Sequence, residues 1–392
     1  MNHDHSNDGS SLESLTQYVF ELLSTDSMEM VLLKSCAPAS VFVASGWEVQ
    51  SDGPIIEAEA VRHIVTQFIK APQGASGGGL SSRQGLSSHW EAMVKETGVH
   101  FSCDLATLRL RISVLSSDSG AVMNVILRKT DPRPRDVMIT GLPGVVVDHV
   151  TNLSSGLVVI CGPSNSGKTT TMYSLLNNIA TNRPMHISTL EDPIEIPMTS
   201  HGRPIWTQRQ VQRDVATPRQ AIADLLRMAP DIIALAEVRD REMAKMTLQL
   251  APAGHLVFIT MHASSTDAAL RALLEFVDQE QRREARAALA ASLACVIGQR
   301  LIVSKSGDRR LLACEYVIPS PSVRKMLSED DSTRFAQFMR FQSEPGRTQS
   351  LTHSIVDMIR SGSISSEEGG RAAHDKDTFE SARRANWVVP RA

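Results

Sequence analysis

The chain of 392 residues has few aromatic residues, and it lacks a surplus of charge of either sign. Aromatic residues make up 4% of the chain, so side chains on which the bases of a single strand could stack are scarce. Forty basic and 43 acidic residues give a formal charge of −3, without the basic excess typical of a nucleic-acid binder. We therefore expect no direct binding of nucleic acid.

Signals for secretion and membrane insertion are also missing from the sequence. Residues 1–12 are polar and contain no apolar stretch of the kind found in a signal peptide. No run of about 18 apolar residues occurs, so no transmembrane helix is expected. The five cysteines are scattered and form no Cys-x-x-Cys pair, which argues against a disulfide framework and a zinc site. These features predict a cytoplasmic protein.

The length and the changing pattern along the chain predict two domains and a C-terminal extension. The expected division is a disordered tail (1–14), an α+β domain (15–128), a linker (129–147), an α/β domain (148–342) and a helical segment with a polar tail (343–392). Strands are predicted in the first domain within 39–44, 108–115 and 122–128. The glycine- and serine-rich segment Gly74–Ser82 is expected to be a flexible loop.

Apolar runs alternate with helix-like segments in the second domain. The runs are Leu157–Cys161, His186–Leu190, Asp231–Ala236 and Leu256–Met261. The helix-like segments between them are Lys168–Ile179, Thr217–Met228 and Asp240–Leu250. This alternation predicts a parallel sheet that is buried on both faces. Beyond Thr266 the chain is expected to be entirely helical, with an Ala- and Arg-rich helix from Gln279 to Val296.

A phosphate-binding loop is indicated by the pattern Gly-x-x-x-x-Gly-Lys-Thr directly after the first apolar run. In such a loop the glycines let backbone N–H groups approach the phosphates, and the following helix adds its N-terminal dipole. Lys168 is expected to reach the β- and γ-phosphates of ATP, and the Thr169 hydroxyl to bind Mg²⁺. The predicted nucleotide-binding residues are Gly162, Pro163, Ser164, Asn165, Ser166, Gly167, Lys168, Thr169 and Thr170.

Polar side chains follow the other three apolar runs. Ligands bind at the carboxyl ends of the strands in open α/β sheets, and Glu191, Glu237 and His262 stand at these ends. A P-loop hydrolase needs a group that activates water, a carboxylate near Mg²⁺ and a sensor of the γ-phosphate. Glu191, Glu237 and His262 are the candidates for these roles in that order.

These motifs together resemble the bacterial type II/IV secretion and type IV pilus ATPases. The matching segments are Gly162–Thr169 as Walker A, Thr189–Glu195 as the acidic box, Pro230–Asp240 as Walker B, Gly254–His262 as the histidine box, and Gln299–Leu301. The resemblance implies a homohexameric ring, with ATP bound between an N-terminal PAS-like domain and a RecA-like domain. It also implies that Glu191 is the catalytic base and that Glu237 supports Mg²⁺.

Further expectations follow from this resemblance. Ring ATPases commonly use an arginine of a neighbouring subunit to stabilise the transition state, and the candidates are Arg109, Arg111, Arg209 and Arg213. The implied partners are inner-membrane platform proteins, which would hold a cytoplasmic motor peripherally at that membrane. Pilus retraction, secretion and conjugation fit about equally well as the process served.

The sequence departs from the usual family pattern at two positions near the nucleotide. Asn165 stands where Walker A often has glycine, and Ala236 replaces the glycine before the Walker B glutamate.

Two alternatives stay open beside the motor. One is a RecA-like translocase of nucleic acid, which the charge and the scarcity of aromatics disfavour. The other is a P-loop switch that binds ATP with little turnover, which an intact Glu191 disfavours and Ala236 leaves open.

Overall fold

The computed structural model divides into two compact units, and the boundary falls between residues 132 and 133. This boundary lies inside the predicted linker 129–147, and the segments 195–197 and 307–309 belong by their contacts to the first unit. The predicted loop Gly74–Ser82 lies outside the described residues. The structure describes residues 8–25, 28–70, 90–95, 98–105, 108–118, 121–131, 133–198, 204–211, 214–215, 217–329, 332–341 and 344–384.

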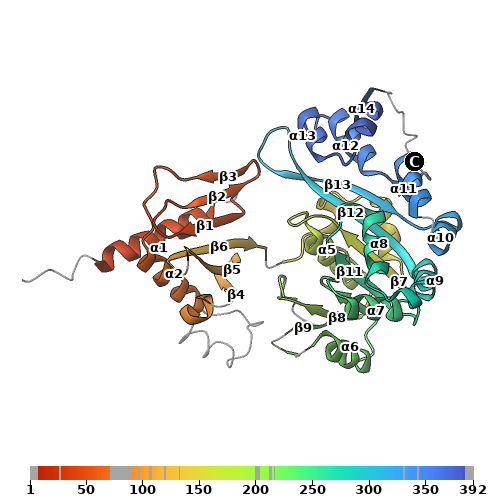
Figure 1. Ribbon diagram of the computed structural model, residues 1–392, viewed down its shortest axis with the longest axis horizontal. Helices are drawn as coiled ribbons and strands as arrows, with labels where there is room; N and C mark the ends of the chain where they lie inside the picture. Colours follow the sequence, from red (N-terminus) through yellow and green to blue (C-terminus); the bar gives the residue numbers. More distant parts are fainter. Residues whose placement is uncertain are drawn as a thin grey trace, which may run out of the picture. The chain divides into compact units, whose positions relative to one another are not determined.

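The first unit contains an antiparallel sheet of six strands in the order β3-β2-β1-β6-β5-β4. The strands are β1 (Met30–Lys34), β2 (Ser40–Val43), β3 (Gly46–Val49), β4 (Val99–Leu105), β5 (Leu108–Ser117) and β6 (Val122–Thr130). Helices α1 (Asp8–Ser24) and α2 (Ala58–Lys70) pack against each other and on this sheet (Figure 1). The expected α+β organisation and the three predicted strands of this unit are therefore present.

Helix α1 begins at Asp8, inside the segment 1–14 that was predicted to be a disordered tail. The apolar spacing explains the difference, because Leu12 continues the helical pattern of Leu15, Val19 and Leu22 by one turn toward the N-terminus. Leu12 packs against the core of the first unit, and the other three side chains are buried in it.

The second unit contains a sheet of eight strands in the order β14-β13-β12-β7-β11-β10-β8-β9. The strands are β7 (Gly156–Cys161), β8 (His186–Glu191), β9 (Ile205–Gln210), β10 (Ile232–Leu235), β11 (Leu256–Met261), β12 (Leu293–Val303), β13 (Arg310–Val317) and β14 (Thr348–Gln349). From β12 to β9 all neighbours are parallel, and β7, β10 and β11 are buried along their whole length. The four predicted apolar runs are confirmed as parallel strands.

Helices cover this sheet and extend beyond it at the C-terminus (Figure 1). They are α4 (Gly144–Thr151), α5 (Lys168–Asn182), α6 (Pro218–Arg227), α7 (Arg241–Leu250), α8 (Thr266–Glu275), α9 (Arg282–Ser292), α10 (Pro321–Ser328), α11 (Ser332–Phe341), α12 (Leu351–Arg360), α13 (Ser366–Ala372) and α14 (Lys376–Arg384). Side chains cap two of the predicted helices, since Thr217 accepts from Gln220 N–H and Asp240 accepts from Met243 N–H.

The expectation that the chain is entirely helical beyond Thr266 is wrong. The Ala-rich helix α9 ends at Ser292 instead of Val296, and the next residues form the long strands β12 and β13. Alanine continues a helical pattern easily, but Val296 and Ile297 are β-branched, and they pair in register with Val159 and Ile160 of β7. Tertiary pairing with a buried strand therefore overrides the local helical preference.

Candidate active site

The loop that carries the phosphate-binding pattern connects β7 to α5. Gly167 precedes the first turn of α5 with φ of 85°, and Asn165 also has a positive φ, of 62°. Asparagine is among the few residues other than glycine that adopt this left-handed conformation readily. Asn165 therefore preserves the backbone of the loop at a position where glycine is usual.

Strand β12 supports the loop from one side. The amide Nε2 of Gln299 donates to the Ser166 carbonyl oxygen at 2.5 Å. A Cβ atom on Gly162 would lie 2.5 Å from the backbone oxygen of Gln299 and from the Ser166 hydroxyl, so only glycine fits between them. Among the described residues, Ser166 Oγ and Gln299 Oε1 are buried without a hydrogen-bond partner. Strand β12 thus packs closely against the loop.

The Lys168 side chain lies over its own loop. It is 9% exposed, and its ammonium donates to the carbonyl oxygens of Gly162 at 3.0 Å and Pro163 at 2.9 Å. Thr169 and Thr170 follow in the first turn of α5 and are half-buried, whereas Pro163 and Ser164 are exposed. A lysine beside a loop of this conformation at a helix N-terminus fits the phosphates of a nucleotide.

Glu191 ends β8 as predicted, and neighbouring side chains hold its carboxylate. The residue is 2% exposed. Its Oε1 accepts hydrogen bonds from the Tyr173 hydroxyl at 2.5 Å, the Thr189 hydroxyl at 2.6 Å and Gln208 Nε2 at 3.0 Å. Burial and the neighbouring Glu191 raise the pKa of Tyr173 well above its ordinary value, so this hydroxyl stays protonated.

Glu237 and His262, which follow β10 and β11, lie in contact. His262 Nε2 is 2.8 Å from Glu237 Oε1, and Arg239 pairs with the other oxygen of the same carboxylate. The Glu237 side chain is 17% exposed and that of His262 is 47% exposed. Ala236 is tied to the neighbouring strands, because its N–H donates to Leu190 and its carbonyl accepts from the Thr260 hydroxyl. Glu237 and His262 were chosen because ligands bind at the carboxyl ends of strands, which we call the strand-end rule. The fold brings these two residues together.

Comparison with known proteins assigns the chain to a family. A family model described as "Type II/IV secretion system protein" matches residues 95–356, about two-thirds of the chain. The chain belongs to this family.

Individual members show the same likeness. The chain is 31% identical over 271 residues to the type IV pilus retraction ATPase PilT of Pseudomonas aeruginosa, a match that covers 69% of this chain and 77% of that protein. It is 28% identical over 260 residues to the type IV pilus ATPase PilU of the same organism, covering 66% and 67%. A crystal structure of the pilus retraction motor PilT with ADP superposes with a TM-score of 0.74 at 25% identity, covering 93% of this chain and 98% of that one. The mixed α/β fold is thus that of this secretion and pilus family.

Each predicted arginine that the structure describes is held by an acidic residue. Arg109 is 9% exposed, and it pairs with Asp104 at 2.8 Å. Arg111 pairs with Glu195 at 2.8 Å, and Arg209 pairs with Asp224 at 3.0 Å. The fourth candidate, Arg213, lies outside the described residues.

Among the described residues, no group of three or more His, Cys, Asp and Glu side chains forms a metal cluster. Within the same described ranges, no helix is long and apolar enough to cross a membrane.

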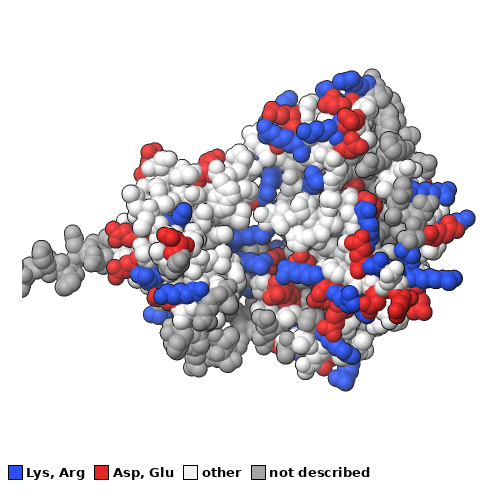
Figure 2. Space-filling model, viewed as in Figure 1, with Lys and Arg blue, Asp and Glu red and all other residues white. Residues whose placement is uncertain are grey.

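On the face that Figure 2 shows, basic and acidic side chains are interspersed over the second unit. Asp278 illustrates the pattern, because it takes Lys245 at 2.5 Å and also pairs with Arg241. The hydrogen bond from Lys245 and the charge of Arg241 lower the pKa of Asp278.

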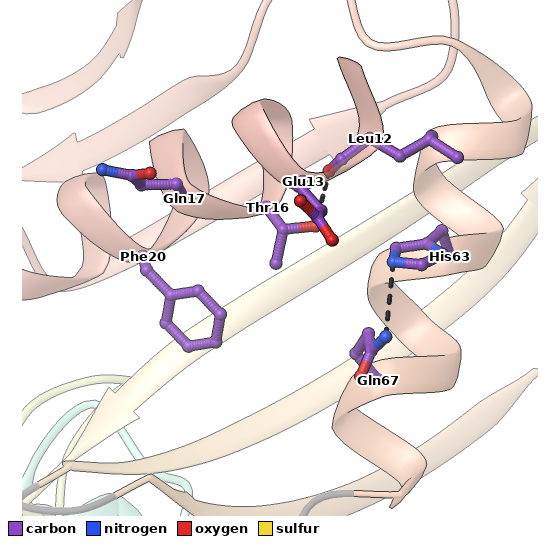
Figure 3. A pocket seen from close by; sticks show the side chains of 7 residues that line it. All are labelled: Leu12, Glu13, Thr16, Gln17, Phe20, His63 and Gln67. Carbon is purple, nitrogen blue, oxygen red and sulfur yellow. Dashed lines mark hydrogen bonds between the residues drawn. The ribbon is translucent and has the colours of Figure 1, made fainter. Parts of the chain in front are cut away.

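A cavity of about 470 Å³ lies apart from these residues, between α1 and α2 in the first unit (Figure 3). Its lining contains Leu12 and Phe20 together with Glu13, Gln17, His63 and Gln67. Figure 3 shows His63 hydrogen-bonded to Gln67, one turn further along α2. None of the predicted site residues belongs to this lining.

Sequence reasoning missed four residues whose side chains contact the predicted site residues: Tyr173, Gln208, Arg239 and Gln299. Arg239 follows Glu237 by two residues and could have been found as its neighbour. Gln299 belongs to a segment that matches the family pattern, but that pattern assigned no role to its side chain. Tyr173 and Gln208 offer no local signal, because only the folded sheet brings α5 and β9 to Glu191.

Proposed function

We propose that the chain is an ATP-hydrolysing motor of a type IV pilus or of a related secretion or conjugation machine. The observation that carries this proposal is the arrangement at one edge of the sheet. The phosphate loop follows β7, Glu191 ends β8, and Glu237 follows β10, which pairs with β8. The family and the similarity to the retraction ATPase PilT support the same function.

The site residues would have separate roles in hydrolysis. Lys168 would exchange the two loop carbonyls for the β- and γ-phosphates of ATP. Mg²⁺, held by the Thr169 hydroxyl and Glu237, would neutralise phosphate charge. Glu191 would accept a proton from the water that attacks the γ-phosphorus, while the bond from that phosphorus to the bridging oxygen of ADP breaks. His262, in contact with Glu237, would respond to the γ-phosphate.

The proposed assembly is a homohexamer of two-domain subunits. The order β12-β7-β11-β10-β8, with the phosphate loop after the second of these strands, supports a RecA-like domain. The antiparallel sheet and paired helices of the first unit are the proposed PAS-like domain. Arg111 and Arg209 have side chains that are 34% and 18% exposed, so they are better placed than Arg109 to serve a neighbouring subunit. Platform proteins would hold this cytoplasmic ring at the inner membrane.

The function is tested by release of phosphate from ATP with and without Mg²⁺. We expect Mg²⁺-dependent turnover by the full chain, which Lys168→Ala abolishes because the phosphates lose their ammonium partner. The matched control is Lys245→Ala, which removes an ammonium from the surface pair with Asp278 and should leave turnover within about twofold. Absence of turnover in the wild type, or full turnover by Lys168→Ala, would contradict the proposal.

The ring is tested separately by light scattering at high protein concentration with ATP and Mg²⁺. A mass of six chains is the expected result. A mass of one chain under these conditions would contradict the hexamer and would leave the assignment of hydrolysis to be judged by the phosphate assay.

A further inference from the structure

The hydrogen bonds that reach Glu191 form a chain in which each group donates toward the carboxylate. The chain starts at a backbone N–H group. Met198 N–H donates to Gln208 Oε1 at 2.6 Å. Because a backbone N–H can only donate, this contact identifies the oxygen of the Gln208 amide, and the NH₂ group points to the other side. There Nε2 donates to the Tyr173 hydroxyl at 2.9 Å and to Glu191 Oε1 at 3.0 Å.

Tyr173 is the next donor in this chain of hydrogen bonds. Its hydroxyl accepts from Gln208, so its single proton is directed to Glu191 Oε1 at 2.5 Å. Burial keeps the pKa of Tyr173 well above its ordinary value, which maintains the hydroxyl as a donor. The ring is completely buried and stacks on Trp206, with centroids 6.3 Å apart and an interplanar angle of 21°. Both the position and the polarity of this hydroxyl are therefore determined by the fold.

The contacts come from three elements that are distant in sequence. Tyr173 belongs to α5, the helix that carries Lys168 and Thr169 at its start. Gln208 belongs to β9 and lies opposite Thr189 of β8 in the parallel register, so their side chains share one face with Glu191. Met198 follows the segment that leaves Glu191. The network therefore joins the carboxylate to the helix of the phosphate loop and to the edge strand of the sheet.

We propose that Tyr173 and Gln208 are positioning residues that hold the carboxylate of Glu191 in place for its reaction with water. This inference rests on the proposed function, in which Glu191 is the general base. Neither residue has to touch ATP, because both act through the oxygen that they hold. A carboxylate tied by several donors loses less conformational freedom when the transition state forms, and this contribution affects turnover without affecting affinity.

The expected results are losses of kcat with unchanged affinity. Tyr173→Phe removes one donor without changing the packed ring, and Gln208→Leu removes the amide on the opposite side. Each should lower kcat about tenfold, with the KM for ATP and the melting temperature close to those of the wild type. Because the two residues form one network, the double variant should lose less than the product of the two single losses.

Matched controls separate positioning from general damage. Tyr316→Phe removes a hydroxyl from a buried tyrosine of β13, and Gln210→Leu removes a neighbouring amide of β9 whose oxygen accepts from Ile194 N–H at 3.3 Å. Both controls should keep kcat within about twofold of the wild type.

Wild type and Glu191→Gln are measured beside these variants. If the wild type hydrolyses ATP and Glu191→Gln does not, while Tyr173→Phe and Gln208→Leu keep the wild-type kcat or exceed it, positioning is overturned and the proposed function stands. Losses in which kcat, KM and melting temperature change together would also overturn positioning, because they indicate structural damage. An inactive wild type would overturn both proposals.

Discussion

The two predicted site glutamates of the second unit, Glu191 and Glu237, differ in the partners that surround them. Glu191 is 2% exposed, and three uncharged donors meet on its Oε1. The Glu237 side chain is 17% exposed, and the histidine and arginine side chains of His262 and Arg239 contact its two oxygens. One carboxylate is thus held by hydroxyl and amide groups, and the other by side chains that carry or can acquire a positive charge.

This difference matches the two tasks that hydrolysis requires. A general base has to be fixed in place and able to take a proton. In the proposed mechanism Glu237 would exchange the contacts with His262 and Arg239 for Mg²⁺. Residue type alone does not distinguish the two glutamates, and their different partners support the proposed division of roles.

The largest effect is expected from the buried carboxylate. Glu191→Gln keeps the size of the side chain but removes its ability to take a proton, so kcat should fall about 10²- to 10⁴-fold. Affinity for ATP should stay within a few-fold, as measured with a fluorescent analogue. The control is Asp192→Asn, which neutralises the exposed carboxylate next in the chain and should cost little. Equal losses in both variants would remove the distinction between Glu191 and a general effect of negative charge.

An effect of several-fold is expected at the other glutamate when Arg239 is removed. Arg239→Ala takes away a guanidinium that competes with Mg²⁺ for Glu237, so the Mg²⁺ concentration for half-maximal turnover should fall. A Mg²⁺ titration of the ATPase rate at saturating ATP measures this shift. The control Arg241→Ala removes a guanidinium that pairs with Asp278 instead. A requirement for more Mg²⁺ in Arg239→Ala would show that the arginine helps the metal site.

The smallest effect is expected from a third carboxyl group of the second unit, which is also buried. Glu315 of β13 is 6% exposed, and it accepts from Thr266 N–H at 2.6 Å. Burial raises its pKa from 4.5 to about 7. Between these values the folded chain binds more protons than the unfolded chain, so this residue lowers stability as the pH rises through 4.5 to 7.

Glu315→Gln keeps an acceptor for Thr266 and removes the titration. The free energy of unfolding of the variant should therefore gain about 2 kcal/mol relative to the wild type between pH 5 and pH 8, as measured by chemical denaturation. Glu329→Gln, at an exposed position, should show no such gain. A difference between Glu315→Gln and the wild type that does not depend on pH would show that burial does not control this group.

Much of the second unit could be predicted from its sequence, because continuous apolar runs and the phosphate loop leave few alternatives. The runs before Glu191, Glu237 and His262 form parallel strands. The strand-end rule predicted Glu237 and His262 at one edge of the sheet, and the structure shows them in contact. Local patterns were less reliable where tertiary pairing decides, as at Leu293–Val303, where an Ala-rich helix passes directly into a strand.

The surroundings of the glutamates could not be predicted. Tyr173 precedes Glu191 by 18 residues and Gln208 follows it by 17, and no spacing rule connects them. The partners of Arg109, Arg111 and Arg209 were equally hidden, since each arginine is recognisable from its motif but its acidic neighbour is not. The chemistry of a single residue type could thus be inferred from the sequence, and the contacts that tune it required the fold.

The most direct test of the distinction between the two carboxylates is a Mg²⁺ titration of ATP hydrolysis by Glu191→Gln and Glu237→Gln at saturating ATP. We predict that Glu237→Gln needs at least about tenfold more Mg²⁺ for half-maximal turnover, because the proposed metal ligand is lost. Glu191→Gln should retain the wild-type Mg²⁺ requirement while its residual kcat is strongly reduced. The opposite assignment, with the Mg²⁺ requirement changed by Glu191→Gln and unchanged by Glu237→Gln, would contradict the account.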